Sequence, residues 1–492
     1  MSKLVAILGT SSSAGKSTIV LVLARLLRKR GLKVAPFKPQ NMSLNSTSTW
    51  NGEEIAYAQY IQCIACESEP TALNNPVLLK PHTSKSSELI VLGKSIQLVQ
   101  PGNYYNNITE KLREVIAYSL RKLLETNDVV IMEGAGAGFE PNLASRDIAN
   151  IYPLLYCIRN NIDLKVIIVT DIYRGGAYTS LLGLYTSLPK SIQRHVVGFL
   201  INKFCGDEKI LENANKWLRS RTGKEVLGVL EYRQDLDIMP EDSLNISPKY
   251  SGKIDIAIVA YPYMSNFNEF HMLRFIDDIA IRYVRTPHEL GEPDIIILPG
   301  SRNVFESLKY LKNVELDRKL YKLAGSTLIV GICGGFQILS NRVSDPHGLE
   351  QGFPSHMAGL GLLDTEFVYG LRKTVSRTVA LTIPSNIVEG DLTVLGYEIH
   401  RGIQLKFRKP LFRIVQRNRE NMKSELEGCV DEKNLVIGTS IHESLLNVKF
   451  LNNLLKNIGK KVPEVNVFDI YLEYCDKAVT YFSKRVYIEN LL

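Results

Sequence analysis

The chain of 492 residues contains no apolar run that approaches the ~20 residues needed by a membrane-spanning helix. Insertion into a membrane is therefore not expected. The N-terminus also lacks the features of a secretory signal, because the short apolar run from Leu4 to Leu8 stops at Gly9 and no small-residue cleavage site follows. These absences predict a cytoplasmic protein.

Cysteine is scarce, with seven residues at irregular spacing in the whole chain. So few cysteines exclude a disulfide framework, and we expect reduced thiols. Cys63 and Cys66 form a C-x-x-C, but no second Cys or His pair lies at zinc-finger spacing, and the flanking residues favour a helix. A metal or redox role for this pair is not predicted.

The sequence has no block of Lys and Arg interleaved with aromatic residues, although its formal net charge is +8. A nucleic-acid partner is therefore not expected. A mild positive charge suits small anions such as ATP and polycarboxylates, so we expect small-molecule partners. The sequence leaves the oligomeric state open, including a homo-oligomer.

Short apolar runs alternate with amphipathic stretches in two series, which predicts two α/β domains, each built on a mostly parallel sheet. We expect domains at residues 1–240 and 254–450, a polar linker at 241–253 and a helical extension at 451–492. The expected strands are Leu4 to Leu8, Val129 to Met132, Lys165 to Thr170, Val196 to Ile201, Ile256 to Ala260, Ile295 to Leu298, Thr327 to Ile332 and Leu435 to Gly438, with further irregular or antiparallel strands between Thr374 and Phe412.

A phosphate-binding loop is predicted where the first strand meets a helix. Backbone N–H groups of such a loop face phosphates, Lys16 can reach the terminal phosphates and the Ser17 hydroxyl can bind Mg²⁺. Thr10 replaces the first glycine of the commonest pattern, and Gly9 lies one residue earlier, as in dethiobiotin synthetase, which this loop resembles. The residues expected to bind ATP are Gly9, Thr10, Ser13, Gly15, Lys16, Ser17 and Asn202.

Polar residues at other strand ends could complete this site. Glu133 ends an apolar run and precedes Gly134-Ala135-Gly136, so with Ser17 it is the expected Mg²⁺ ligand. Asp171 ends another strand, and its role as a helix cap or a functional acid stays open. The candidates for contacting substrate or phosphate are Lys38, Gln40, Asn41, Asn45, Asp171 and Arg174; for the segment after Phe37, a plain surface loop is the alternative.

A cysteine lies at a sharp strand-to-helix turn in the second half, in Gly331-Ile332-Cys333-Gly334-Gly335. This pattern predicts a nucleophile elbow, in which the helix N-terminus favours the thiolate. The N–H groups of Gly334 and Gly300 are the expected oxyanion donors. His442, after a late strand, is the expected base, so Cys333 and His442 are the predicted catalytic pair.

These residues, Pro299-Gly300-Ser301, the Cys333 elbow and a late His442, resemble class I glutamine amidotransferases. Most of those enzymes have His-Pro-Glu, in which the glutamate orients the imidazole, whereas here Glu443 adjoins His442 directly. We therefore expect a Cys-His dyad, and a third member stays open.

A P-loop synthetase followed by such a domain is the architecture of the cobyric and cobyrinic acid amide synthases. The chain resembles this family over residues 1 to about 450, in Lys38 to Ser46, Asn75 to Pro81, Glu133 to Gly136, Asp171 to Gly176, Leu298 to Ser301 and Gly396 to His400. Pro39-Gln40-Asn41-Met42 stands where the cobyrinic acid a,c-diamide synthases have a Gly-Pro-Asp-Tyr type of segment, which favours the cobyric acid branch.

The resemblance implies ATP-dependent and Mg²⁺-dependent amidation of corrinoid carboxylates through acyl phosphates, with glutamine as nitrogen donor and the corrinoid as substrate. The implied reaction converts adenosylcobyrinic acid a,c-diamide to adenosylcobyric acid in cobalamin biosynthesis. The alternatives are cobyrinic acid a,c-diamide synthase, a ligase acting on a cell-wall precursor, and a P-loop ATPase with a binding-only thiol domain. The intact Cys333 and His442 disfavour the last of these.

Overall fold

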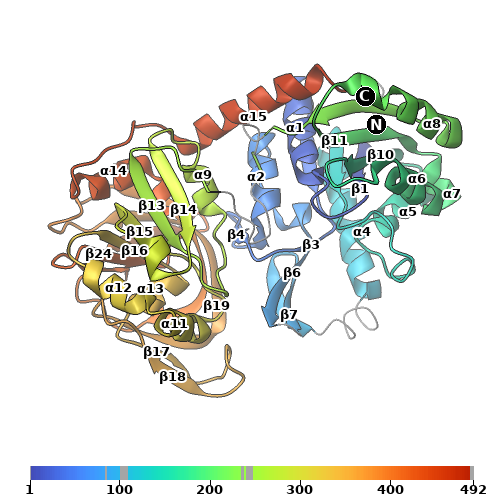
Figure 1. The fold of residues 1–492 in the computed structure, drawn as a ribbon. Helices are drawn as coiled ribbons and strands as arrows, with labels where there is room; N and C mark the ends of the chain where they lie inside the picture. The colour runs from blue at the N-terminus through green and yellow to red at the C-terminus, as the bar shows by residue number, and fades with distance from the viewer. Residues whose placement is uncertain (1, 84–85, 100–108, 234–237, 240–247, 488–492) are drawn as a thin grey trace. The chain divides into compact units, whose positions relative to one another are not determined.

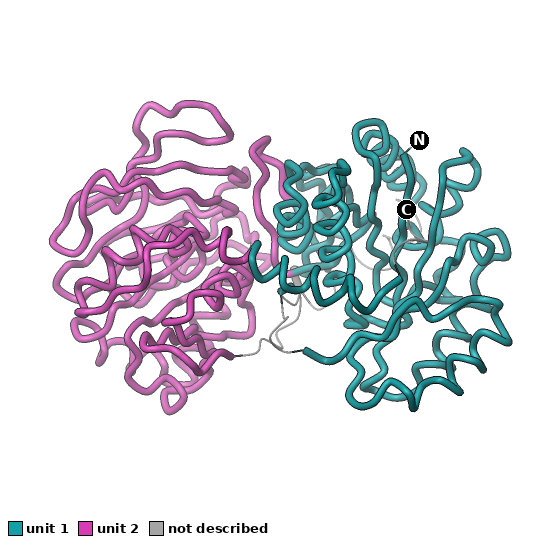
Figure 2. Tube along the Cα trace, turned by 90° about the horizontal axis from the view of Figure 1, so that it is seen from above, with its two compact units in different colours: residues 1–43, 55–240, 472–492 teal, residues 44–54, 241–471 magenta. Residues whose placement is uncertain are grey.

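The computed structural model describes residues 2–83, 86–99, 109–233, 238–239 and 248–487. The chain forms two compact units (Figure 2). Unit 1 comprises Met1–Ser43, Ile55–Pro240 and Leu472–Leu492, and unit 2 comprises Leu44–Glu54 and Glu241–Tyr471. This division differs from the expected one, since Leu44–Glu54, the expected linker and residues 451–471 of the expected extension all belong to unit 2, and Leu472–Leu492 belongs to unit 1. Residues 241–247 of the expected linker lie outside the described residues.

The main sheet of unit 1 has six parallel strands in the order β12-β11-β10-β1-β9-β2. Both faces of its central strands are buried, which explains why these strands are continuous apolar runs. The four strands predicted for this half are confirmed. The bounds are β1 (Lys3–Gly9), β2 (Val34–Phe37), β9 (Val129–Glu133), β10 (Asp163–Asp171), β11 (Val196–Phe204) and β12 (Glu225–Glu231).

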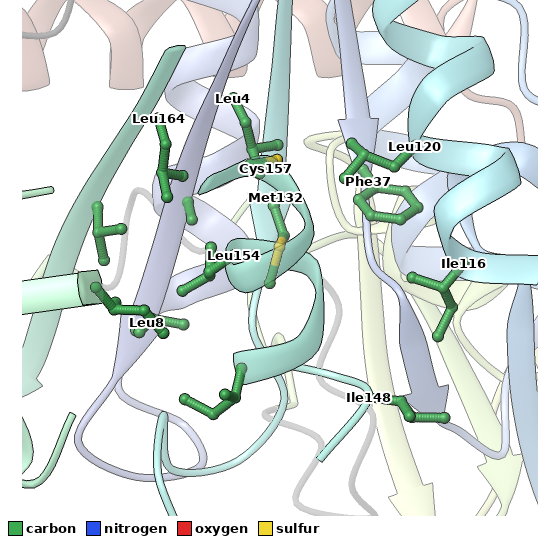
Figure 3. Close-up of a cluster of buried hydrophobic side chains, with 14 of the residues drawn as sticks. Leu4, Leu8, Phe37, Ile116, Leu120, Met132, Ile148, Leu154, Cys157 and Leu164 are labelled. Carbon is green, nitrogen blue, oxygen red and sulfur yellow. The ribbon is translucent and has the colours of Figure 1, made fainter. Parts of the chain in front are cut away.

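Helices cover this sheet, and a large apolar core fills the space between them (Figure 3). Leu4 and Leu8 of β1 belong to one buried cluster that also contains Ile116 and Leu120 of α4 and Leu154 of α5. The helices of this unit are α1 (Lys16–Lys29), α2 (Tyr57–Ala65), α4 (Thr109–Thr126), α5 (Ile151–Arg159), α6 (Ala177–Ser187), α7 (Lys190–Gln193) and α8 (Glu212–Thr222).

The polar segment after β2 forms the first strand of a small sheet with the order β3-β6-β7-β8. The chain then enters β4, which pairs with β5. The bounds are β3 (Gln40–Met42), β4 (Ser46–Ser48), β5 (Glu54–Ala56), β6 (Val77–Thr83), β7 (Ser86–Val91) and β8 (Lys94–Val99).

Unit 2 contains a sheet in the order β14-β13-β15-β16-β24-β23, parallel except for its last pair. The four strands predicted here are confirmed, within two residues at each end. Most elements of this part of unit 2 are labelled in Figure 1. Their bounds are β13 (Ile254–Val259), β14 (Ile279–Val284), β15 (Ile295–Leu298), β16 (Leu328–Ile332), β23 (Cys429–Asp431), β24 (Val436–Thr439), α9 (Glu269–Leu273), α10 (Pro287–Leu290), α11 (Val304–Asn313), α12 (Leu316–Leu323), α13 (Gly334–Leu339) and α14 (Val448–Lys456).

A second, largely antiparallel sheet completes unit 2, as predicted for the stretch from Thr374 to Phe412. Its strands are β17 (Arg342–Asp345), β18 (Ser355–Ala358), β19 (Glu366–Thr382), β20 (Thr393–Gln404), β21 (Phe412–Arg417) and β22 (Glu420–Glu427). The last helix is α15 (Val467–Ser483), and the predicted helical character after Phe450 is confirmed. Among the described residues, no helix combines the length and apolarity needed to span a membrane.

Candidate active sites

The phosphate loop joins β1 to α1, and its geometry depends on Gly15. This residue adopts a left-handed conformation with φ of 98°, immediately before the helix. A Cβ added to Gly15 would lie 2.0 Å from Nδ2 of Asn202, which donates a hydrogen bond to the Ala14 carbonyl at 3.0 Å. Only glycine fits this position. The end of β11 thereby places Asn202 directly against the loop.

Lys16 lies between the phosphate loop and the glycine-rich loop after β9. Its ammonium donates hydrogen bonds to the carbonyls of Ser11 at 2.9 Å and Gly136 at 2.8 Å. Burial lowers the pKa of Lys16 to about 8, partly opposed by the carboxylate of Glu133. A phosphate in the loop would add negative charge beside the ammonium and favour its protonated form.

Glu133 is the centre of the site in unit 1. It is 1% exposed and accepts hydrogen bonds from Ser17 Oγ, Lys38 Nζ and Gln62 Nε2, each at 2.7 Å. Burial raises the pKa of Glu133, but Lys38 and these hydrogen bonds outweigh burial and hold the pKa below its usual value. The structure thus brings Ser17, Glu133 and Lys38 together, and adds Gln62, which the sequence did not single out.

The other candidates for substrate contact are divided between two places. Asn41 lies near Glu133, because its amide donates to Gln59 Oε1 at 2.9 Å, and Gln59 in turn contacts Glu133 at 3.5 Å. Gln40 precedes it in β3. Asn45, by contrast, is fully buried in unit 2, where its side chain accepts hydrogen bonds from backbone N–H groups of that unit. Its contacts therefore do not support the expected role in binding phosphate.

Asp171 makes one contact within its own turn and one toward the phosphate loop, and it caps no helix, because α6 begins at Ala177 with Gly176 at its N-cap. Its Oδ1 accepts a hydrogen bond from the Tyr173 N–H at 2.9 Å, which is a local turn contact. Its Oδ2 lies 3.3 Å from Lys203 Nζ, and Lys203 also donates to the Ser13 carbonyl of the phosphate loop at 2.8 Å. Nε of Arg174 lies 3.7 Å from Oδ2 of Asp171, and the Arg174 side chain is 71% exposed to solvent. Lys203 was missed because nothing in its local sequence marks it.

Cys333 sits at a strained turn in unit 2, between β16 and α13. Its φ is 51°, in the left-handed region that non-glycine residues rarely adopt. Burial raises the pKa of this thiol, but the neighbouring His442, with His400 and the Gly334 N–H, outweighs burial and lowers it. The thiolate, which is the nucleophilic form, is therefore favoured.

The glycines around Cys333 permit close packing that brings the two expected oxyanion donors together. A Cβ on Gly335 would lie 1.8 Å from the Leu298 carbonyl, and one on Gly334 would lie 2.4 Å from the Ser301 nitrogen. A Cβ on Gly300 would lie 3.2 Å from Cε1 of His442. Gly334, next to the thiol, thus packs on Ser301, the residue after Gly300, and Gly300 lies beside the imidazole, so both expected oxyanion donors are close to the Cys333–His442 pair.

His442 is fully buried, and a carboxylate contacts its Nδ1. Its Nδ1 lies 2.6 Å from Oε1 of Glu269, the first residue of α9. The Tyr397 ring stacks on the imidazole, with centroids 4.7 Å apart and planes 10° apart. Despite the opposing effect of burial, Glu269 and Cys333 raise the pKa of His442 to about 10. Within the described residues Nε2 completes no hydrogen bond, and it remains the nitrogen available for proton transfer with the thiol.

Glu269 corrects the expectation of a Cys-His dyad, because it supplies the third member of a triad. Sequence reasoning missed it since it lies 173 residues before His442. The available signal was a single acid in the apolar stretch Phe267 to Leu273. Glu443 does not take this role, because its carboxylate pairs with Arg377 at 2.7 Å.

His400 is a further residue near the thiol that sequence reasoning used only for the family resemblance. Its Nδ1 is 2.8 Å from the Gly402 carbonyl and its Nε2 is 3.4 Å from Oε1 of Glu398. Although burial opposes it, Glu398 raises the pKa of His400. The protonated form of His400, which Glu398 favours, adds positive charge near Cys333 and so favours the thiolate.

We expect Glu269→Gln to lower glutamine hydrolysis by roughly one to two orders of magnitude, and His442→Asn by roughly two or more. Without the carboxylate the pKa of His442 falls, so the thiolate-imidazolium pair should be lost at lower pH. The alkaline limb of glutaminase kcat/KM should therefore move to lower pH in Glu269→Gln.

The matched control is Glu443→Gln, which changes the adjacent carboxylate but leaves the Glu269 to His442 contact in place. It should keep most glutaminase activity and the normal pH profile, measured as glutamate release. A loss in Glu443→Gln equal to that in Glu269→Gln would contradict the assignment of the triad.

Family models match both units. The model described as CobQ/CobB/MinD/ParA nucleotide binding domain matches residues 5–246, and the one described as CobB/CobQ-like glutamine amidotransferase domain matches residues 255–450. These matches confirm the predicted order of a nucleotide-binding P-loop domain followed by an amidotransferase-like domain.

Full-length relatives agree with this order. A protein named probable cobyric acid synthase from Methanocella arvoryzae is 40% identical over 464 residues, which cover 93% of this chain and 91% of the relative. Cobyric acid synthases from Clostridium botulinum and Limosilactobacillus reuteri are each 37% identical over 92% of this chain, covering 90% and 88% of their own lengths. The chain therefore belongs to the cobyric acid synthase family of glutamine-dependent amide ligases.

Proposed function

We propose that this enzyme amidates side-chain carboxylates of a corrinoid, converting adenosylcobyrinic acid a,c-diamide to adenosylcobyric acid with ATP, Mg²⁺ and glutamine. The observation that carries the proposal is the convergence of Ser17, Lys38 and Gln62 on the buried Glu133. This cluster joins the phosphate loop to the Lys38–Asn41 segment, which is where a substrate carboxylate would have to meet the γ-phosphate.

The residues present fit a Mg²⁺ ion. The Ser17 hydroxyl and the Glu133 carboxylate, 2.7 Å apart, are oxygen ligands of the kind that Mg²⁺ prefers. Among the described residues no group of three or more His, Cys, Asp or Glu could hold a metal, which agrees with an ion held by few protein ligands together with phosphates. Bound there, Mg²⁺ would neutralise charge on the phosphates of ATP.

Carboxylate activation begins when an oxygen of the substrate carboxylate attacks the γ-phosphorus and ADP leaves. Lys16 stabilises the negative charge on the transferred phosphoryl group, and Lys38 lies where it can hold the incoming carboxylate. Ammonia then attacks the acyl carbon, phosphate leaves, and loss of a proton gives the amide. A free carboxylate resists this attack because it offers no comparable leaving group.

The triad in unit 2 supplies the ammonia. The Cys333 thiolate attacks the side-chain amide carbon of glutamine, and Gly300 and Gly334 donate hydrogen bonds to the developing oxyanion. The His442 imidazolium gives its proton to the departing ammonia, and the neutral imidazole then takes a proton from the water that hydrolyses the thioester. Glutamate leaves, and the Cys333 thiolate and the His442 imidazolium are restored.

The test is mass spectrometry of the corrinoid after incubation with the protein, ATP, Mg²⁺ and glutamine. Each conversion of a carboxylic acid to an amide lowers the mass by about one dalton, and [¹⁵N-amide]glutamine should place its label in each new amide. Cobyrinic acid without the a and c amides is the control substrate. Its efficient conversion, with no conversion of the a,c-diamide, would favour the other branch of the family.

A further inference from the structure

The segment Leu44–Glu54, which we name the coupling segment, lies in the P-loop half of the sequence but forms part of unit 2 (Figure 2, magenta). Its residues Asn45 to Ser48 are polar and fully buried. Burying polar groups is costly unless each finds hydrogen-bond partners, so the contacts of this segment reveal what it holds in place.

The coupling segment holds the loop that presents Glu269. Oδ1 of Asn45 accepts hydrogen bonds from the backbone N–H groups of Phe267 at 2.9 Å and Asn268 at 3.3 Å. From the other side, Oδ1 of Asn266 accepts from the Ser46 N–H at 3.0 Å. The next residue after Asn268 is Glu269, whose carboxylate contacts His442. Asn45 therefore fixes the backbone from which this carboxylate projects.

A second set of contacts reaches the other side of the imidazole. Arg377 donates a hydrogen bond to Thr47 Oγ1 at 3.4 Å, and its guanidinium lies over the Tyr397 ring, 5.9 Å from the centroid. Tyr397 in turn stacks on His442. The coupling segment thus supports two neighbours of the imidazole, the carboxylate behind it and the ring beside it.

The coupling segment continues directly from the nucleotide site of unit 1. Residues Gln40–Met42 form β3, and Lys38 just before them pairs with Glu133 at 2.7 Å. A ligand that binds an oxygen of the Glu133 carboxylate would compete with the Lys38 ammonium for that oxygen. If Lys38 then moved, only five residues of backbone would separate the displaced residue from Leu44, where the coupling segment begins.

We propose that Leu44–Glu54 couples the two activities, with Asn45 acting as a positioning residue that sets the Glu269 loop according to occupancy of the nucleotide site. The positioning of Glu269 concerns glutamine hydrolysis alone, whereas the response to the nucleotide rests on the proposed ATP-dependent function. Glutamine is then hydrolysed fastest when the carboxylate to be amidated is being activated.

The first experiment measures glutaminase kcat/KM against pH without nucleotide. Asn45→Leu, which removes the acceptor oxygen at similar size, should lower glutaminase activity by about tenfold and move the alkaline limb to lower pH, because Glu269 no longer supports His442 fully. Asn45→Asp keeps an acceptor oxygen and should keep most activity. Asn266→Ala, which breaks the contact from the other side, should resemble Asn45→Leu.

The matched control is Asn453→Leu, because Asn453 is also buried in unit 2 and accepts a backbone N–H, that of Glu389, at 2.9 Å. It should leave the pH profile unchanged. An unshifted profile in both Asn45→Leu and Asn266→Ala would overturn the positioning role, and so would an equal shift in Asn453→Leu or an equal loss in Asn45→Asp. Ammonia-dependent amidation, measured in parallel, should stay within about twofold of the wild type.

The second experiment compares glutaminase rates with and without ATP, Mg²⁺ and corrinoid. The wild-type rate should rise about fivefold or more, the usual scale of coupling between two sites, and this ratio should fall toward one in Asn45→Leu. A wild-type ratio of one would overturn the coupling. Failure of the proposed function is distinguishable, since it would appear as absent ammonia-dependent amidation in the wild type itself.

Discussion

Replacing Cys333 with alanine or serine is expected to abolish glutamine-dependent amide synthesis while ammonium salts still support it. Among the described residues of the elbow, Cys333 carries the sole nucleophilic side chain, and its lowered pKa favours the thiolate, the form expected to attack glutamine. Serine cannot substitute because its hydroxyl is far harder to ionise than the thiol. The loss should reach several orders of magnitude, on the scale seen when a nucleophile is removed.

The measurement compares amidated corrinoid formed from glutamine with that formed from ammonium chloride at a pH near 8.5, where free ammonia is available. Circular dichroism would verify that the variants are folded. If a folded Cys333→Ala enzyme lost both activities, the two units would not divide the reaction as described.

Lys16→Ala should remove amidation with either nitrogen source. The ammonium of this lysine lies in the phosphate loop, where it stabilises charge that develops during phosphoryl transfer, and no later step can proceed without the acyl phosphate. We expect a loss of roughly three or more orders of magnitude in corrinoid amidation, with glutamate release retained when nucleotide is absent.

The retained glutaminase serves as the internal control for folding, and Lys29→Ala serves as the matched variant, because this lysine ends the same helix at a half-exposed position. Lys29→Ala should amidate at close to the normal rate. Substantial ammonia-dependent amidation by Lys16→Ala would contradict a role of the phosphate loop in forming the acyl phosphate.

Local patterns in the sequence predicted the two sites where the chemistry depends on consecutive residues. The phosphate loop needs a strand, a glycine turn and a lysine within a few positions, and the Cys333 elbow needs glycines on both sides. The central parallel strands were equally predictable, since they must be continuously apolar, whereas edge strands such as β12 and β14 were not among those expected. Glu133 was found because it ends such a strand directly before a glycine-rich loop.

The residues that escaped prediction act across long separations in sequence. Glu269 reaches His442 only because α9 and the end of β24 meet in the folded unit, and the single acid beside Phe270 does not by itself indicate which distant residue it contacts. The contacts of Asn45 could not be predicted because its neighbours Lys38 and Asn41 lie in unit 1 near Glu133, while the chain enters unit 2 within three residues of Asn41. The amino-acid composition around Leu44 gives no sign that the chain passes from unit 1 to unit 2 there.

The interleaving of the two units also has a consequence for how the protein is made. Unit 2 needs Asn45 to meet Phe267, 222 residues later, and unit 1 needs Arg25 to meet Asp476, 451 residues later. Closing such long loops is entropically costly and slow, so neither unit can finish folding as an independent block during synthesis. Unit 1 starts first on the ribosome but is completed last, once the C-terminal helix has emerged to pair with Arg25.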